Sequence, residues 1–158
     1  MVSIIRFKNF KLFRDWQTLE IKPITILIGK NNTGKTAVLK LPTMIAGCLN
    51  RNDWSKLELE NQSVRIEYSY EGLFYNRELN AEPLVFEVYA KDEKIIETTY
   101  IGEINGNIKL KKYIYKGQEV NLNRKNGIKQ KDMPQLNFDY IEIYRNKPDY
   151  TIRKPYKK

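Results

Sequence analysis

Residues 29–36 read Gly-Lys-Asn-Asn-Thr-Gly-Lys-Thr, a spacing of residue types that suits the binding of a phosphate chain. Gly29 allows the backbone to leave a strand sharply, and Gly34 allows it to approach a phosphate closely. Successive backbone N–H groups from Asn31 to Thr36 can converge on one anion. A helix that starts here would point its N-terminus, with its free donors, at the same place. The sequence therefore predicts a phosphate-binding loop.

Two side chains of this loop have predicted roles toward a nucleotide. Lys35 would reach the β- and γ-phosphates, and the Thr36 hydroxyl would coordinate the Mg²⁺ ion that the phosphates also bind. Like the loop as a whole, these roles depend on a strand before it and a helix after it. The full set of expected nucleotide-binding residues is Gly29, Lys30, Asn31, Asn32, Thr33, Gly34, Lys35, Thr36 and Ala37.

The flanks of the loop have the patterns that such a site requires. Residues 24–28 form a continuous, mostly β-branched apolar run, which predicts a strand buried on both faces of a sheet. Residues 37–49 carry apolar side chains at helical spacing. Pro42 lies inside that segment and has no N–H for the carbonyl of Val38, so the helix is expected to kink or restart there.

The rest of the chain has the pattern of antiparallel strands. Residues 2–10 predict a strand, and residues 17–22 predict its hairpin partner. Beyond residue 63, alternating strands are expected at 64–70, 84–89 and 108–115. Asn105-Gly106 lies between two apolar-alternating runs and is the strongest hairpin signal in the chain. Residues 120–139 are expected to form a basic loop.

Composition excludes several classes of chemistry. The chain has 158 residues with no histidine and a single cysteine, Cys48. An internal disulfide, a Cys/His zinc site and a histidine base from this chain are therefore excluded. Cys48 itself lies in an apolar stretch and is expected in the core. Neither a membrane-length apolar run nor a signal peptide is recognisable, so no membrane association and a reducing, cytoplasmic location are expected.

The net charge of +9 is unevenly distributed. Residues 1–104 contain 14 Lys and Arg against 14 Asp and Glu, whereas residues 105–158 contain 14 against 5. A basic segment beside a neutral body suggests an anionic partner such as nucleic acid or nucleotide phosphates. A lysine-rich solvated surface explains the same charge equally well. The strand tyrosines leave a similar choice between base stacking and cross-strand packing, of which packing is favoured.

Residues 5–13, 19–21 and 24–36 together resemble the N-terminus of ABC-type ATPases of the SMC, RecF and OLD class. The resemblance covers residues 1 to about 45, and it is strongest to the stand-alone, AAA-like prokaryotic ATPases found in defence loci. A weaker similarity, at residues 140–148, is to the strand that ends the first lobe of these ATPases. The resemblance implies ATP and Mg²⁺ as ligands, head-to-tail dimerisation, and a second lobe with a signature motif and a Walker B motif.

The resemblance also implies where adenine and ribose would lie, near Arg6, Lys11, Phe13 and Trp16. Hairpin packing is the alternative role for Phe13 and Trp16, and it is favoured. Arg145 would sense the γ-phosphate or the lobe interface, with an exposed structural arginine as the alternative. Gln118, Gln130 and Gln135 are weak candidates for orienting water. The sequence departs from the family pattern because it contains neither a signature motif nor a Walker B motif.

We therefore expect an α/β fold, the first lobe of a P-loop NTPase. It would have a mixed sheet, one main helix after the phosphate loop and an antiparallel β subdomain. The expected division is residues 1–50 for the strand, hairpin, loop and helix, 51–145 for the β subdomain, and 146–158 for a basic tail at the junction to a second lobe.

The expected function is ATP–Mg²⁺ binding, with hydrolysis requiring that second lobe or a homodimer partner. DNA or an effector nuclease would be a further partner, in a DNA-associated function or in anti-phage defence. The alternative is a non-enzymatic nucleic-acid or partner-binding β module with a vestigial nucleotide loop.

Overall fold

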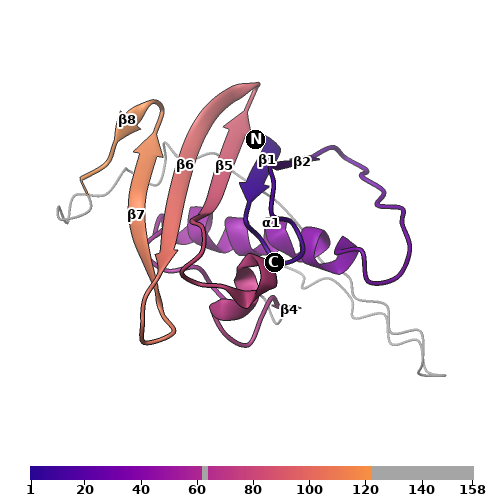
Figure 1. The fold of residues 1–158 in the computed structure, drawn as a ribbon. Coiled ribbons are helices and arrows are strands. Elements are labelled where there is room, and N and C mark those ends of the chain that lie inside the picture. The colour runs from indigo at the N-terminus through magenta and orange to yellow at the C-terminus, as the bar shows by residue number, and fades with distance from the viewer. Residues whose placement is uncertain (62–63, 122–158) are drawn as a thin grey trace.

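The computed structural model describes residues 1–61 and 64–121, in which a six-stranded antiparallel sheet packs against one main helix (Figure 1). Every strand pair in the sheet is antiparallel. The strands occur in the spatial order β2 (Gln17–Glu20), β1 (Val2–Lys8), β5 (Leu84–Ala90), β6 (Glu93–Gly102), β7 (Ile108–Tyr115) and β8 (Gln118–Glu119).

The alternation of apolar side chains explains which face of the sheet is buried. Phe7 of β1 lies opposite Phe86 of β5, and Leu84 of β5 lies opposite Tyr100 of β6. All four side chains are buried, because residues at every second position share one face of a strand. The predicted hairpin at Asn105-Gly106 is confirmed and joins β6 to β7.

The opposite face of the sheet carries a row of ion pairs. Glu87 of β5 contacts Arg6 and Lys94, each at 3.0 Å. Lys94 also contacts Glu97, which in turn contacts Lys112 of β7 at 3.0 Å. The hydrogen bond from Lys94 to Glu97 raises the pKa of this lysine to about 12, and Glu87 adds to the effect against a smaller opposing effect of burial. Alternating cations and carboxylates thus span four strands.

The helix α1 (Lys35–Arg51) lies across the apolar face of the sheet. Residues 41–49 are all buried, as expected for a helix covered on more than one side. The sheet covers one side of the helix, and the segment that follows the helix covers another. In that segment Asn61 donates a hydrogen bond to the carbonyl of Thr43 at 2.7 Å. The helix continues through Pro42 as one element, so of the two expected outcomes, a kink or a restart, the restart is wrong. Burial of this stretch offsets the one backbone hydrogen bond that Pro42 removes.

A small two-stranded sheet follows, made of β3 (Glu60–Asn61) and β4 (Val64–Arg65). The predicted strand at 64–70 is therefore much shorter than expected. After β4 the N–H groups of Ile66 and Glu67 both donate to the carbonyl of Leu59, which bends the chain out of the ladder. Two short segments come next: η1 (Glu71–Leu73), a single 3-10 turn, and η2 (Tyr75–Arg77), a turn in which Asn76 has a non-helical backbone.

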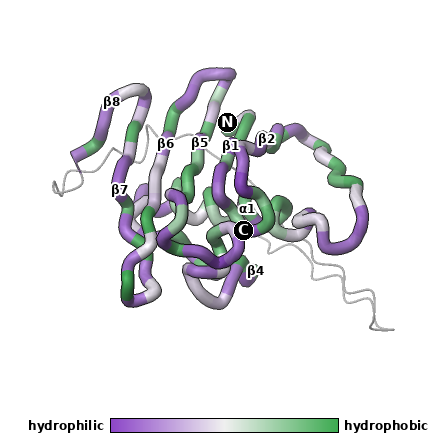
Figure 2. Tube along the Cα trace, in the orientation of Figure 1, coloured by the Kyte–Doolittle hydropathy of each residue, from purple (hydrophilic) through white to green (hydrophobic). Residues whose placement is uncertain are grey.

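Residues 24–28 do not form the buried strand that their composition predicts. They pair with no strand among the described residues, and the side chains of Ile24, Ile26 and Ile28 are 80%, 76% and 93% exposed. Figure 2 shows this apolar stretch in the loop between β2 and α1. The chain turns away from the sheet directly after β2, where the Thr25 hydroxyl donates to the carbonyl of Glu20 at 3.1 Å. In the described residues, the predicted mixed sheet with a separate antiparallel subdomain is instead one six-stranded antiparallel sheet beside the small β3–β4 pair, because β1 pairs directly with β5.

Across residues 1–61 and 64–121, no helix is both long and apolar enough to cross a membrane. The same residues contain no group of three or more acidic, cysteine or histidine side chains placed to hold a metal ion.

Candidate functional site

The predicted phosphate loop leads directly into the first turn of α1. Asn32 and Gly34 have φ angles of +63° and +84°, so the loop alternates into the left-handed region just before the helix. The left-handed φ is one reason for a glycine at position 34. The second is steric, because a Cβ atom there would lie 2.7 Å from the Phe13 ring. Gly29 differs: its φ is not left-handed, and a Cβ atom there would lie 3.0 Å from the Thr33 hydroxyl and 3.8 Å from Cδ of Lys35, both in side chains. The Phe13 ring is therefore packed directly against the loop at Gly34.

Residues 31–37 line a pocket, and their backbone amides have no acceptor among the described residues. The pocket has a volume of about 660 Å³, which lies within the range of small-ligand sites. The first hydrogen bond of the helix runs from the N–H of Val38 to the carbonyl of Gly34, at 3.0 Å. The N–H groups before Val38 are therefore available to an anion, and the helix dipole favours negative charge at the same place.

The Lys35 side chain folds back over the loop. Its ammonium group donates to the carbonyl of Gly29 at 2.7 Å and to the carbonyl of Lys30. The Thr33 hydroxyl also donates to the Lys30 carbonyl, at 2.9 Å. A phosphate would therefore compete with backbone carbonyls for the Lys35 ammonium. The Thr36 hydroxyl is exposed on the first turn of α1 and has no hydrogen-bond partner among the described residues.

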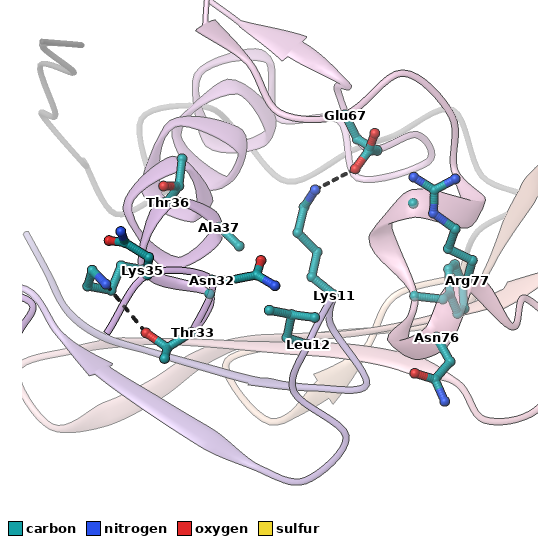
Figure 3. Close-up of a pocket in the computed structure, with 14 residues that line it drawn as sticks. Lys11, Leu12, Asn32, Thr33, Lys35, Thr36, Ala37, Glu67, Asn76 and Arg77 are labelled. Carbon is teal, nitrogen blue, oxygen red and sulfur yellow. Dashed lines mark hydrogen bonds and ion pairs between the residues drawn. The ribbon is translucent and has the colours of Figure 1, made fainter. Parts of the chain in front are cut away.

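The opposite wall of the pocket comes from the turn after β1 and from the segment around η1 and η2. It consists of Lys11, Leu12, Glu67, Gly72, Phe74, Asn76 and Arg77. Lys11 lies between this segment and the start of α1 (Figure 3). The backbone N–H of Lys11 donates to the carbonyl of Leu73 at 2.8 Å, which ties the turn to η1.

Lys11 and Glu67 form a short ion pair in this wall. The ammonium lies 2.6 Å from Oε2 of Glu67 and donates to the carbonyl of Ile66 at 3.2 Å. Burial alone would raise the pKa of the Glu67 carboxyl, but hydrogen bonds from Lys11 and from the N–H of Tyr68 outweigh burial, and the pKa lies below its ordinary value. Glu67 is therefore a carboxylate anion at neutral pH.

Asn76 and Arg77 both have left-handed backbones, with φ angles of +52° and +62°. Such consecutive left-handed residues are strained for L side chains, and strain of this kind concentrates at functional sites. Arg77 lines the pocket, and no described residue accepts a hydrogen bond from its guanidinium group. Nothing local in the sequence singles out Glu67, Asn76 or Arg77, because only the folding of distant segments places them opposite the loop.

The residues expected near adenine are not all gathered at this pocket. Lys11 lines it, whereas Arg6 lies on the outer face of the sheet and is bonded to Glu87. The Arg6 guanidinium also stacks over Trp16, 4.8 Å from the ring centroid. Phe13 lies beneath Gly34 and makes an edge contact with Phe7, with ring centroids 5.6 Å apart.

The remaining candidates lie away from the pocket or outside the described residues. Gln118 belongs to β8 at the edge of the sheet and does not line the pocket. Gln130, Gln135, Arg145 and the predicted strand at 140–148 lie outside the described residues. Cys48 is buried as expected, and burial raises the pKa of its thiol to about 12.

Comparison with known proteins identifies one protein family. The family model described as AAA ATPase domain matches residues 1–156, which is nearly the whole chain. The search of curated proteins found no match to this chain. The family match implies a P-loop NTPase lobe and a nucleotide ligand, in agreement with the phosphate loop at the start of α1.

Proposed function

The chain belongs to the AAA ATPase domain family, and from that premise we propose that residues 29–37 bind ATP together with Mg²⁺. The observation that carries this proposal is the set of backbone amides at residues 31–37. These amides lack acceptors among the described residues, and the residues that carry them line a pocket at the N-terminus of α1. Converging amides, a helix dipole and a nearby ammonium group are the means by which proteins bind phosphate chains.

The side chains of the loop fit a bound magnesium ion. Thr36 presents an oxygen ligand of the kind Mg²⁺ prefers, and this hydroxyl has no hydrogen-bond partner among the described residues. The ion would neutralise charge on the phosphates when bound. Lys35 would exchange its contacts with the Gly29 and Lys30 carbonyls for contacts with the phosphates.

We propose further that hydrolysis requires groups beyond those described here. Phosphoryl transfer needs a residue that orients or activates the attacking water. Among the described residues the carboxylate in the pocket is Glu67, which is paired with Lys11 and has a lowered pKa. A general base works best with a pKa near the working pH, so Glu67 suits that role poorly. A second lobe, in the same chain or in a partner copy, would supply the missing groups.

The biological setting is proposed from the resemblance to defence-locus ATPases and from charge. Residues 105–158 hold 14 of the 28 Lys and Arg residues and 5 of the 19 acidic ones. A basic segment of this kind supports an interaction with DNA, whose affinity would fall steeply with added salt. An effector nuclease would be a further partner, in the cytoplasm.

The proposed nucleotide site is tested by titrating the chain with ATP–Mg²⁺ in a calorimeter. Lys35→Ala should weaken binding at least tenfold, because it removes a charge-assisted contact worth roughly 1.5–3 kcal/mol. Lys111→Ala is the matched control, since Lys111 is exposed on β7 and does not line the pocket. Equal affinity of wild type and Lys35→Ala would reject the proposal. Salt-sensitive DNA binding by a chain that ignores ATP would instead support the β-module alternative.

A further inference from the structure

The pocket holds a carboxylate in the wall that faces the phosphate loop. The Glu67 side chain is only 16% exposed and lines the same pocket as the amides of residues 31–37 (Figure 3). A carboxylate in a site for a polyanion is unfavourable unless it has a partner, because like charges repel strongly where water is partly excluded. Glu67 has such a partner in Lys11, and the pair makes this end of the pocket chemically different from the end formed by residues 31–37.

The position of Glu67 is fixed by its neighbours. Lys11 donates to Oε2 at 2.6 Å, and the N–H of Tyr68 donates to Oε1 at 2.9 Å. Gly72 leaves room for the side chain, since a Cβ atom at that position would lie 2.4 Å from Cγ and Cδ of Glu67. Lys11 comes from a distant turn, Tyr68 is the next residue in the chain and Gly72 lies in η1, so the carboxylate is held in place before any ligand arrives.

The hydrogen-bonding capacity of Glu67 is only partly used. An ionised carboxylate has about four acceptor positions, and the contacts from Lys11 and Tyr68 occupy two. Since the carboxyl is ionised at neutral pH, it accepts hydrogen bonds and donates none. A phosphate oxygen cannot satisfy the open positions, whereas a hydroxyl or amino group can.

We infer that Glu67 accepts hydrogen bonds from the nucleoside end of the bound nucleotide, from its ribose hydroxyls or its exocyclic amine, and thereby selects nucleotides over bare polyphosphates. This inference rests on the proposed function, because it takes the phosphates to be at residues 31–37. The amides and Lys35 attract the charged tail, and Glu67 repels it. The ligand is thus oriented with its uncharged donors toward Glu67 itself, rather than toward the cations Lys11 and Arg77 of the same wall.

The experiment compares ATP–Mg²⁺ with magnesium tripolyphosphate as ligands of wild type and Glu67→Gln. Loss of a hydrogen bond to a charged acceptor should weaken ATP binding about tenfold. Tripolyphosphate should bind several-fold more tightly, because the variant removes a like charge and releases Lys11. The matched control is Glu71→Gln, at an exposed glutamate of η1 that does not line this pocket, and it should change neither affinity.

A second variant moves the carboxylate without changing its charge. Gly72→Ala places a methyl group against Glu67, so it should weaken ATP binding and leave tripolyphosphate binding nearly unchanged. Two ATP analogues identify the donor: 2′,3′-dideoxy-ATP lacks the ribose hydroxyls, and inosine triphosphate lacks the exocyclic amine. The analogue without the true donor should bind wild type as weakly as ATP binds Glu67→Gln.

The outcomes separate this inference from the proposed function. If Lys35→Ala abolishes ATP binding while Glu67→Gln leaves the ratio of ATP to tripolyphosphate affinity unchanged, the inference is overturned and the nucleotide site stands. If wild type binds neither ligand, both fail together. Circular dichroism and thermal melting of each variant establish that affinity changes are not caused by unfolding.

Discussion

Gly34→Ala tests whether the phosphate loop is held in the conformation described. Gly34 has a φ of +84°, and a Cβ atom there would lie 2.7 Å from Cε2 and Cζ of Phe13. The substitution therefore has two separate penalties, one from the backbone conformation and one from the ring. Because Gly34 immediately precedes α1, both penalties act on the site that is proposed to bind phosphates.

The two penalties have different magnitudes and can be separated. A left-handed backbone costs an alanine about 1–2 kcal/mol, and overpacking costs about 1–3 kcal/mol. Gly34→Ala should therefore lower the free energy of unfolding by about 2–5 kcal/mol. Gly106 is the matched position, with a φ of +80°, and a Cβ atom there would meet only the Glu71 carboxylate, at 3.9 Å. Gly106→Ala should lose only the backbone part, about 1–2 kcal/mol.

The assay is urea denaturation of both single variants, of Phe13→Ala and of the Phe13→Ala/Gly34→Ala double variant. Removing the ring should cancel the steric part, so the double-mutant cycle should give a coupling energy of about 1–3 kcal/mol. If Gly34→Ala is no more destabilising than Gly106→Ala and the coupling is zero, Phe13 does not fix the loop and the reasoning is refuted.

Two further predictions concern stability. Ile26→Ala should change the free energy of unfolding by less than about 0.5 kcal/mol, because Ile26 is 76% exposed. In the same denaturation assay, Ile45→Ala in the buried half of α1 should lower the free energy of unfolding by about 2–5 kcal/mol. Equal losses would show that residues 24–28 are buried after all. Stability should also be constant from about pH 6 to 8, because the chain has no histidine and the Cys48 thiol titrates at about 12. Below about pH 4.5 stability should fall, since carboxylates with a lowered folded-state pKa stabilise the fold above their ordinary pKa and lose that contribution as the pH drops. A transition between pH 6 and 8 in denaturation midpoints would contradict this assignment. The carboxyls concerned are Glu20, Asp53, Glu67, Glu82 and Glu97.

The sequence predicts those parts of the molecule that depend on local chemistry. The helix that starts at Lys35 and the hairpin at Asn105-Gly106 follow from apolar periodicity and from turn residues, and the structure contains both. The phosphate-binding role of residues 29–37 stays a prediction. The strand expected at 24–28 is absent, because a run of apolar residues does not reveal whether the segment pairs with a neighbouring strand. An apolar run has the same pattern whether neighbouring strands bury it or, as here, it lies exposed and unpaired in the described residues.

The residues of the second wall of the pocket could not be predicted from the sequence, for a different reason. Lys11 and Glu67 are 56 positions apart and meet only because the turn after β1 packs on η1. The requirement for Gly34 is similar: the motif explains its left-handed φ, whereas the close approach of Phe13 is a tertiary contact. Long-range packing thus decides which side chains face the loop.

The most direct test of the central claim is amide hydrogen exchange of the chain with and without ATP–Mg²⁺. The amides of residues 31–37 have no acceptor among the described residues, so they should exchange rapidly in the free protein. Bound phosphates should protect these amides strongly, with little change along β6 and β7. Unchanged exchange at residues 31–37 under saturating ATP, or protection confined to another part of the chain, would contradict the account.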